Sequence, residues 1–300
     1  MLTRKLTRQL ADITLAVTLF TVIALPACSH RTRIVVGCKN FTEQIILGEL
    51  ISQQIENKAH LSVERRFYLG GTYIAHQSML AGRIDLYPEY TGTALTAVLK
   101  QEPASDHLAV YARVKSEYQR RFHLTLGPAF GFNDTFAIEI RGADARRLHL
   151  QTISQAAQFT PEWRAGFGYE FMERPDGYSG LVALYGLRFA APPRIMDLGL
   201  LTRALKEGRV DLIAGNVTDG LIPALDLFVL EDDKHYFPPY EAVPLIREQT
   251  LGEHPELRQV LDDLGGKISD DDMRRLNYAV DGQKQDVKQV VMEFLKRRSL

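Results

Sequence analysis

The chain has 300 residues, and its 36 lysine and arginine residues nearly balance its 37 aspartate and glutamate residues, which leaves a formal net charge of −1. This balance argues against a nucleic-acid partner, because binding to a phosphate backbone needs a strongly positive surface. The chain has only two cysteines, and no cluster of cysteine and histidine with the spacing of metal ligands. A chain of this length can bury a large core and form two lobes.

The first 28 residues have the layout of a bacterial lipoprotein signal. Residues 1–12 are polar and basic, and residues 13–25 form an almost wholly apolar run that is too short for a comfortable membrane span. The run leads into Leu-Pro-Ala-Cys, so we expect a signal peptide over residues 1–28 that ends at a lipidated Cys28. An ordinary signal peptide cut before this cysteine and a short uncleaved anchor are the alternatives. Acyl chains on Cys28 would tether the protein to the extracytoplasmic, periplasmic face of the cell membrane.

From residue 33 onward the sequence alternates between short apolar strands and helices. The expected strands lie at 33–38, 61–68 and 85–90. Between the first two strands, Asn40 is expected to cap a helix, with Glu43 as its capping-box partner. Further helices are expected at 70–82, 92–99 and 107–122. This β-α-β-α-β order predicts an α/β fold with a mostly parallel sheet flanked by helices.

A strand at 136–140 is expected to carry the chain into a second lobe. This lobe has expected strands at 166–171, 194–197 and 211–214 and expected helices at 179–187 and 200–208. The chain then returns, and a charged helical tail from residue 256 closes on the first lobe. We therefore expect the first lobe to comprise 33–135 and 241–300 and the second to comprise 136–240. Two chain crossings between the lobes predict a hinge.

Two segments of the chain repeat one local pattern. Residues 82–92 and 208–220 each begin with Gly-Arg, continue as a short apolar strand and end in a turn that contains threonine. Each first glycine suits the left-handed conformation that follows a helix C-terminus. Ligands of open α/β sheets bind outside the carboxyl ends of the strands, so the two units suggest similar lobes that face one cleft. The alternative is that any helix-to-strand connection has this pattern.

Two longer motifs connect the chain to a known family. Residues 36–44 (Val-Gly-Cys-Lys-Asn-Phe-Thr-Glu-Gln) and 85–93 (Asp-Leu-Tyr-Pro-Glu-Tyr-Thr-Gly-Thr) resemble segments of the osmoprotectant-binding proteins of ABC importers. These are the glycine betaine, carnitine and choline substrate-binding proteins of the quaternary-amine uptake class. Shorter motifs extend the resemblance in the expected order to the C-terminal helices.

The resemblance implies a fold and a function. The fold is the two-lobed periplasmic-binding-protein fold of the type II kind, in which two mixed sheets are flanked by helices and joined by a hinge. A monomer of this kind captures a small quaternary-ammonium ligand between its lobes and delivers it to an ABC permease driven by a cytoplasmic ATPase. It uses no cofactor and no metal, and it performs no catalysis.

The resemblance also implies a binding site, and its chemistry can be stated in general terms. A trimethylammonium group cannot donate hydrogen bonds, so aromatic ring faces and a nearby carboxylate hold it. A ligand carboxylate is held by a guanidinium, an ammonium or a helix N-terminus. The implied cation cage consists of Tyr90, Phe136, Asn216 and Tyr240, with Asp134 beside it. The implied contacts of the anionic end are Lys39, Thr93 and Arg174.

Two cage positions depart from a full set of four tyrosines. Phe136 keeps a ring but lacks the hydroxyl, and Asn216 has no ring at all. The loss of one ring wall could weaken the attraction for a cation by roughly 0.5–2 kcal/mol. The amide of Asn216 offers a donor and an acceptor instead. A larger betaine with a second polar group, such as carnitine or ergothioneine, is therefore an alternative ligand.

Two other classes of protein are alternatives to a transport protein. An enzyme would need a nucleophile elbow, a metal triad or a phosphate-binding loop, and the sequence contains none of these motifs. A ligand sensor that feeds a receptor remains an alternative, because the sequence of a lone binding protein does not separate import from sensing.

Overall fold

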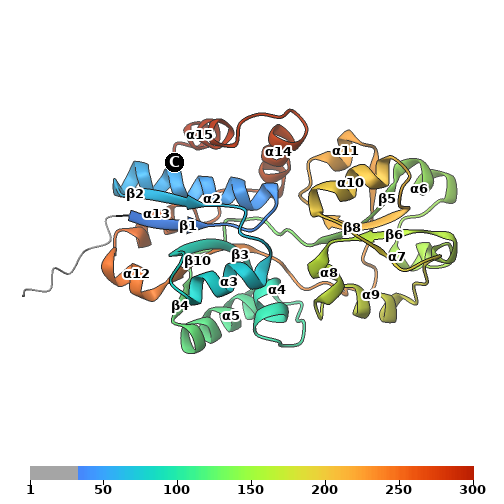
Figure 1. The fold of residues 1–300 in the computed structure, drawn as a ribbon, viewed down its shortest axis with the longest axis horizontal. Helices are drawn as coiled ribbons and strands as arrows, with labels where there is room; N and C mark the ends of the chain where they lie inside the picture. The colour runs from blue at the N-terminus through green and yellow to red at the C-terminus, as the bar shows by residue number, and fades with distance from the viewer. Residues whose placement is uncertain (1–32) are drawn as a thin grey trace, which may run out of the picture. The chain divides into compact units, whose positions relative to one another are not determined.

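The structure is a computed structural model that describes residues 33–300. The expected signal peptide and Cys28 lie outside the described residues. Residues 33–300 form two five-stranded sheets flanked by helices, which confirms the predicted two-lobed α/β fold class (Figure 1). Among these residues, no helix has both the length and the apolar character that a membrane crossing needs.

The first sheet has the strand order β2-β1-β3-β10-β4. Strand β1 runs parallel to β2 and β3, whereas β10 runs antiparallel to both β3 and β4. The strands are β1 (Arg33–Gly37), β2 (Ser62–Arg66), β3 (Leu86–Tyr90), β4 (Leu124–Leu126) and β10 (Ala242–Arg247). The chain that returns from the second lobe thus contributes an internal strand, β10, to the first sheet.

The second sheet has the order β7-β6-β8-β5-β9 and repeats this arrangement position by position. Strand β6 runs parallel to β7 and β8, and β5 runs antiparallel to both β8 and β9. The strands are β5 (Phe136–Arg141), β6 (Ala165–Phe167), β7 (Arg194–Ile195), β8 (Leu212–Asn216) and β9 (Leu227–Leu230).

Helices cover the faces of both sheets (Figure 1). Those of the first lobe are α2 (Thr42–Gln54), α3 (Thr72–Leu80), α4 (Thr91–Thr93), α5 (His107–Phe122), α12 (Glu248–Glu253), α13 (Leu257–Asp263), α14 (Asp270–Asp281) and α15 (Val287–Arg298). Those of the second lobe are α6 (Gly142–Leu148), α7 (Ile153–Ala156), α8 (Tyr169–Glu173), α9 (Tyr178–Tyr185), α10 (Leu198–Lys206) and α11 (Leu221–Ala224). Short π-helical segments extend α2 over Ile55–Ala59 and α4 over Ala94–Val98, and a 3-10 turn spans Thr160–Glu162.

Strand β1 shows why the first sheet is covered on both faces. Its side chains alternate: Ile34 and Val36 pack into the core beneath α2 and α15, and Val35 packs into the core beneath α3 and α5. All three are buried. A run of consecutive apolar residues is typical of a strand buried on both sides, as the sequence predicts.

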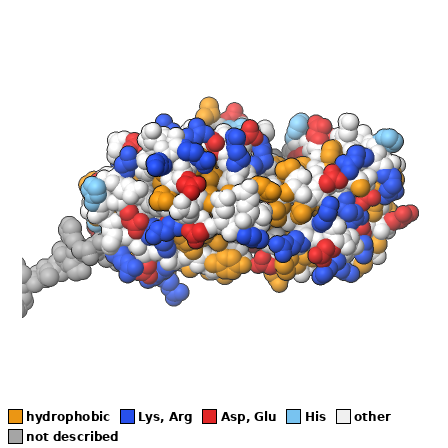
Figure 2. All heavy atoms as spheres, turned by 90° about the horizontal axis from the view of Figure 1, so that it is seen from above, with side chains coloured by type: hydrophobic (Ala, Val, Ile, Leu, Met, Phe, Trp, Pro, Cys, Tyr) orange, Lys and Arg blue, Asp and Glu red, His pale blue; other side chains and the backbone are white. Residues whose placement is uncertain are grey.

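Acidic and basic side chains are interspersed over the face of the protein shown in Figure 2. This agrees with the near-zero net charge of the chain.

Two chain segments cross between the sheets and run beside each other (Figure 1). Asn133 and Glu241 form an antiparallel bridge, and the Asp134 backbone N–H donates to the Tyr240 carbonyl over 3.1 Å. The Tyr240 backbone N–H donates in turn to Asn133 Oδ1 over 2.6 Å. The crossings are therefore tied to each other, which suits a hinge made of a few residues at the ends of elements. The predicted lobe boundaries at 135/136 and 240/241 stay predictions.

The repeated Gly-Arg segments have matching local structures. Gly82 and Gly208 both adopt the left-handed conformation, with φ of 63° and 69°, as predicted. Each following aspartate then accepts from the neighbouring parallel strand: Asp85 Oδ2 accepts from the Val35 N–H over 2.8 Å, and Asp211 Oδ2 accepts from the Arg164 N–H over 3.0 Å. The pattern is thus one structural unit used in both lobes.

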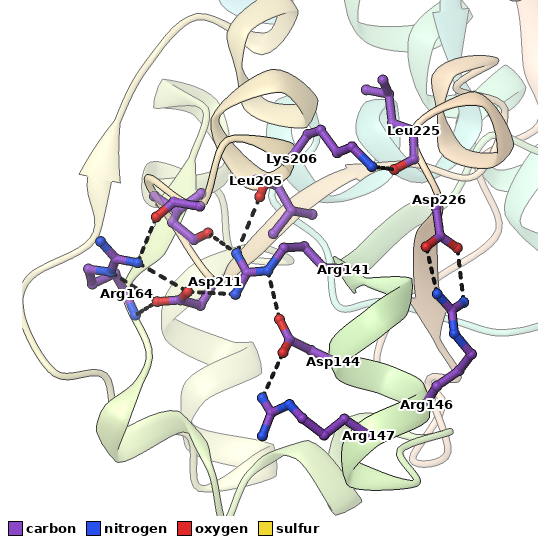
Figure 3. Close-up of polar contacts among 12 residues, drawn as sticks. Arg141, Asp144, Arg146, Arg147, Arg164, Leu205, Lys206, Asp211, Leu225 and Asp226 are labelled. Atoms are coloured by element: carbon purple, nitrogen blue, oxygen red, sulfur yellow. Dashed lines mark hydrogen bonds and ion pairs between the residues drawn. The ribbon is translucent and has the colours of Figure 1, made fainter.

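An arginine completes each of these units. Arg247, the last residue of β10, lies 3.7 Å from Asp85, and Arg141, the last residue of β5, lies 2.8 Å from Asp211. Figure 3 shows Arg141 between Asp211 and Asp144. Because Asp85 directly precedes β3 and Asp211 directly precedes β8, these pairs link the end of β10 to the start of β3 and the end of β5 to the start of β8.

We expect Gly208→Ala to lower the free energy of unfolding by about 1 kcal/mol, because an L-residue in the left-handed region costs about 1–2 kcal/mol. A Cβ atom at Gly208 would meet nothing within 4 Å, so only the backbone conformation is at stake. Gly252, in the exposed part of α12, offers the matched control, since its Cβ also meets nothing within 4 Å and its φ is negative. Gly252→Ala should leave stability unchanged or raised in urea denaturation. Equal effects of the two substitutions would contradict this explanation.

Two local predictions are wrong. Helix α2 begins at Thr42 with Phe41 as its N-cap and no side-chain cap bond, so Asn40 and Glu43 do not form a capping box. Glu43 instead points into the protein, as described below. The strand expected at 166–171 ends at Phe167 and gives way to α8. Phe167 and Phe171 are four residues apart, and their rings pack 5.0 Å from each other in one core, which is equally the spacing of a helix face.

Candidate functional site

A cavity of about 280 Å³ has side chains of both lobes in its wall. The structure brings all eight residues of the expected site to this wall: Lys39, Tyr90, Thr93, Asp134, Phe136, Arg174, Asn216 and Tyr240. Three of them lie at strand ends: Tyr90 closes β3, Phe136 opens β5 and Asn216 closes β8. Asp134 and Tyr240 lie on the two crossing segments.

Aromatic rings form one part of the wall. The rings of Phe136 and Tyr240 meet edge to face, with centroids 5.5 Å apart. Tyr90 stacks on Phe41 at 6.3 Å. Phe171, which also lines the cavity, packs edge to face against Phe136, with ring centroids 4.9 Å apart. The rings are therefore fixed by their own packing, which removes the entropy loss of ordering them around a ligand.

Arg174 brings a buried positive charge to the cavity and links the lobes. Its Nε and Nη2 donate to the two oxygens of Asp176 over 2.9 and 2.5 Å, and its Nη1 donates to Thr93 Oγ1 of the first lobe over 3.1 Å. The guanidinium also lies 5.1 Å from the centre of the Phe136 ring. Burial opposes ionisation of Asp176, but the charge of Arg174 and the hydrogen bonds from Arg174 and Tyr240 together outweigh burial and lower the pKa of the Asp176 carboxyl. The pair is thus charged and pre-oriented.

Lys39 is the second buried cation of the cavity. Its Nζ donates to Thr72 Oγ1 over 2.9 Å and pairs with Glu89 Oε1 at 2.5 Å. The other oxygen of Glu89 accepts from the Tyr87 hydroxyl over 2.8 Å. Lys39 Nζ also lies 5.2 Å from the centre of the Tyr90 ring. Because an ammonium group has three N–H donors, Lys39 can bind an acceptor in the cavity while it keeps both partners.

Glu43 is the residue of this region that the sequence interpretation misplaced. It is buried, and its Oε1 accepts from the Tyr90 hydroxyl over 2.7 Å. Its Oε2 lies 2.6 Å from Thr218 Oγ1, which also lies 2.6 Å from Asp134 Oδ1. A hydroxyl donates one hydrogen, so the second of these contacts requires a proton on one of the two carboxyls. Glu43, Thr218 and Asp134 therefore share a proton between the lobes.

The surroundings of the two carboxyls favour this shared proton. Burial raises the pKa of Glu43 well above its usual range, and the charge of Asp134 raises it further. Burial likewise raises the pKa of Asp134, although hydrogen bonds from Thr218 and Asn216 oppose the shift. Asn277 of α14 also donates to Glu43 Oε2, over 3.1 Å. Asp219, the residue after Thr218, has its pKa raised to about 6 by burial.

We expect the affinity for a cationic ligand to rise with pH. A cation beside Asp134 favours ionised carboxyls, so it competes with the shared proton. Because the pKa values of Glu43 and Asp134 are raised, the competing proton is bound at low pH and leaves as the pH increases. Calorimetry with choline, which has no carboxyl of its own, should therefore give tighter binding at about pH 8 than at about pH 5.

The raised pKa values also make the stability of the ligand-free protein depend on pH, and this stability falls as the pH rises. A carboxyl with a raised pKa stabilises the fold at acid pH, and this stabilisation is lost as the pH rises through its folded-state pKa. An affinity for choline that is constant over this pH range would contradict the shared proton.

Asn216 lies in the cavity wall, as expected for a cage position, and its amide also contacts Asp134. Its Nδ2 donates to Asp134 Oδ2, so the amide orients the carboxylate that faces the cavity. The pairing of Asn216 with Asp134 could not be read from the sequence, because the two residues are 82 positions apart and only the fold brings them together.

Comparison with known proteins agrees with this architecture. The family model described as "Substrate binding domain of ABC-type glycine betaine transport system" matches residues 32–297. The carnitine transport binding protein OpuCC of Listeria monocytogenes is 36% identical over 275 residues, which cover 90% of this chain and 88% of that protein.

Two further relatives broaden the comparison. The ergothioneine transport permease/ergothioneine binding protein EgtU of Helicobacter pylori is 35% identical over 268 residues, which cover 89% of this chain and 48% of that protein. The crystal structure of a glycine betaine/carnitine/choline ABC transporter protein superposes with a TM-score of 0.74 at 33% sequence identity, over 89% of this chain and 98% of that chain.

Proposed function

The chain belongs to the family of substrate-binding domains of ABC-type glycine betaine transport systems, and we propose that it captures a quaternary-ammonium solute of the betaine, carnitine or choline type. The ligand lies in the cavity between the lobes and passes from there to the membrane permease of an ABC importer. The work of the protein is reversible binding, and catalysis has no part in it.

The observation that carries this proposal is that one cavity presents aromatic rings, a carboxylate and two buried cations. Tyr90, Phe136 and Tyr240 present rings near the carboxylate of Asp134, which suits a cation that cannot donate hydrogen bonds. Lys39 and Arg174 present buried N–H groups to the same cavity, which suits a carboxylate. A zwitterionic betaine matches both sets of groups at once.

Contacts between the lobes explain how capture and release can be coupled. Arg174 donates to Thr93, and Thr218, which also contacts Asp134, bonds to Glu43, so hydrogen bonds at both ends of the site span the cleft. We take residues 33–135 and 241–300 as one lobe and 136–240 as the other. Opening at the two crossings breaks these bonds and exposes the ligand, whereas the bound ligand adds contacts to both lobes and favours closure.

Cys28, outside the described residues, is the proposed lipid anchor. Two or more acyl chains on its side chain and amino group would hold the protein at the extracytoplasmic face of the membrane, close to the permease. The protein is expected to act there as a monomer. Mass spectrometry of the membrane-extracted protein tests this anchor directly.

An extended betaine is the second candidate ligand, and Asn216 favours it. This position carries an amide where a fourth ring would complete the cation cage, so the affinity for a small betaine should be reduced. The similarity to a protein named for ergothioneine binding is comparable to the similarity to the carnitine-binding relative. Ergothioneine, a betaine with a nitrogen-containing ring, therefore belongs in any ligand screen.

A thermal-shift screen tests the proposed function. A ligand that binds only the folded protein raises its melting temperature by mass action. We expect shifts with glycine betaine, carnitine, choline or ergothioneine, and no shift with glycine, which has the same carboxylate but no methyl groups on its nitrogen. A shift with glycine alone, or with none of the methylated ligands, would contradict the proposal.

A further inference from the structure

A second cavity, of about 210 Å³, adjoins the first. The two cavities share part of their walls, namely Asn40, Phe41, Asp134, Asp197, Leu198 and Asn216. Asp134 and Asn216 thus lie at the junction. The function proposed above accounts for the first cavity and leaves the second without a role.

Residue 216 has a short side chain at this junction. Asn216 lies directly opposite Phe136 in the antiparallel pair of β8 and β5, so a ring at 216 would stand beside the Phe136 ring. Its amide is held by Asp134 instead, at the border between the cavities. A tyrosine at this position would fill the border with a ring and separate the two spaces.

The wall of the second cavity is rich in hydrogen-bond acceptors. Five carboxyl side chains line it: Glu43, Asp134, Asp197, Asp219 and Asp281. Some of them already accept bonds, since Asp197 accepts from the Gly199 N–H over 3.0 Å and Asp281 accepts from the Thr42 hydroxyl over 2.8 Å. Two cations, Arg203 and Lys284, complete the charged part of the wall. The acids outnumber them.

Asn277 provides an independent sign that this wall receives a donor. Its side chain lines the cavity and is 4% exposed. Its Nδ2 donates to Glu43 Oε2 over 3.1 Å and to the Thr218 carbonyl over 2.9 Å. Its Oδ1 is a buried acceptor without a hydrogen-bond partner among the described residues. Such an acceptor is costly to leave unused, so a donor from a ligand would be favoured there.

Glu139 lies directly behind the same wall. It is fully buried, and neither carboxyl oxygen has a hydrogen-bond partner among residues 33–300. A Cβ atom at Gly215, which lines the cavity, would lie 2.2 Å from Glu139 Oε1. The absent side chain at Gly215 therefore brings this carboxyl up to the cavity wall.

We propose that the second cavity is a subsite for the hydrogen-bond-donating, nitrogen-bearing end of an extended betaine. The inference rests on the proposed function, because the trimethylammonium and carboxylate groups must occupy the first cavity. The substituent on the α-carbon then passes Asn216 and places its N–H groups among Asp219, Asn277 and the neighbouring carboxyls. Small betaines leave this subsite empty.

A pair of ligands that differ in one amine tests the subsite. Lysine betaine carries an ammonium group at the end of its side chain, and norleucine betaine lacks it. Calorimetry with the purified full chain should give at least about tenfold tighter binding of lysine betaine, which corresponds to one charge-assisted hydrogen bond. Equal affinities for the two ligands would overturn the subsite.

Two variants test whether the preference for lysine betaine arises in the second cavity. Asn216→Tyr should abolish the preference for lysine betaine over norleucine betaine. Asp219→Asn, in a residue that lines only the second cavity, should reduce lysine betaine binding about tenfold and leave glycine betaine unchanged. Asp226→Asn is the matched control, because Asp226 is an exposed acid of the same lobe paired with Arg146 (Figure 3).

The outcomes separate the two proposals. If glycine betaine binds but both variants keep the full preference for lysine betaine, the subsite is wrong and the proposed function stands. If none of the betaines binds the unmodified protein, the proposed function itself is wrong, and the subsite falls with it.

Discussion

Arg174→Ala is expected to weaken the binding of glycine betaine by at least roughly 30-fold, since truncating one partner of a buried charge pair costs about 2–5 kcal/mol. Arg174 is 6% exposed and donates to both oxygens of Asp176 and to Thr93. Its loss removes the donor proposed for the ligand carboxylate and leaves the buried Asp176 without its cation. Choline has no carboxylate, so its affinity should fall less in the same calorimetric titration.

Arg146→Ala provides the matched control for this substitution. Arg146 forms an equally bidentate pair with Asp226, over 2.9 and 2.7 Å, but on the exposed surface of the same lobe (Figure 3). Exposed pairs contribute at most about 1 kcal/mol to stability, and no ligand contact is lost. Unchanged affinity for glycine betaine in Arg174→Ala would remove Arg174 from the site.

Tyr240→Ala should weaken glycine betaine and choline alike, by roughly tenfold or more, because both ligands place the same cation against the rings. Tyr240 is buried, packs on Phe136, and donates its hydroxyl hydrogen to Asp176. Tyr240→Phe keeps the ring and loses only this hydrogen bond, so it should retain most of the affinity for choline. Comparing glycine betaine with choline distinguishes the roles of the two residues. Arg174 binds the ligand carboxylate, and Tyr240 binds the ligand cation.

Retention of full choline affinity in Tyr240→Ala would contradict the cation cage. Circular dichroism and the melting temperature of each variant, measured without ligand, distinguish a lost contact from a lost fold.

Local sequence patterns predicted much of the fold. The helix expected at 107–122 is α5, and the glycines expected to end helices before strands, Gly82 and Gly208, both have positive φ. These features depend on residues close in sequence, namely apolar spacing and backbone freedom. The strand expected at 166–171 was wrong because local spacing was ambiguous there. The spacing of Phe167 and Phe171 suits a helix face as well as an apolar strand.

In the candidate site, too, the features set by local sequence could be predicted and those set by distant residues could not. The positions at the strand ends, such as Tyr90 and Asn216, could be predicted because family-like motifs mark them. The partners of these residues could not, because they come from distant parts of the chain. Thr218 and Asn277 lie 175 and 234 residues from Glu43, to which they are bonded. The residues next to Glu43 in the sequence therefore predicted a helix cap. Its actual contacts come from distant residues that the folding of the two lobes brings close to it.

A crystal structure of the protein grown with glycine betaine or choline tests the central claim most directly. The account predicts the trimethylammonium group against the rings of Tyr90, Phe136 and Tyr240, with the Asp134 carboxylate beside it, and the carboxylate of glycine betaine on Arg174. A ligand bound outside this cavity, or bound with its methyl groups turned away from the three rings, would contradict it.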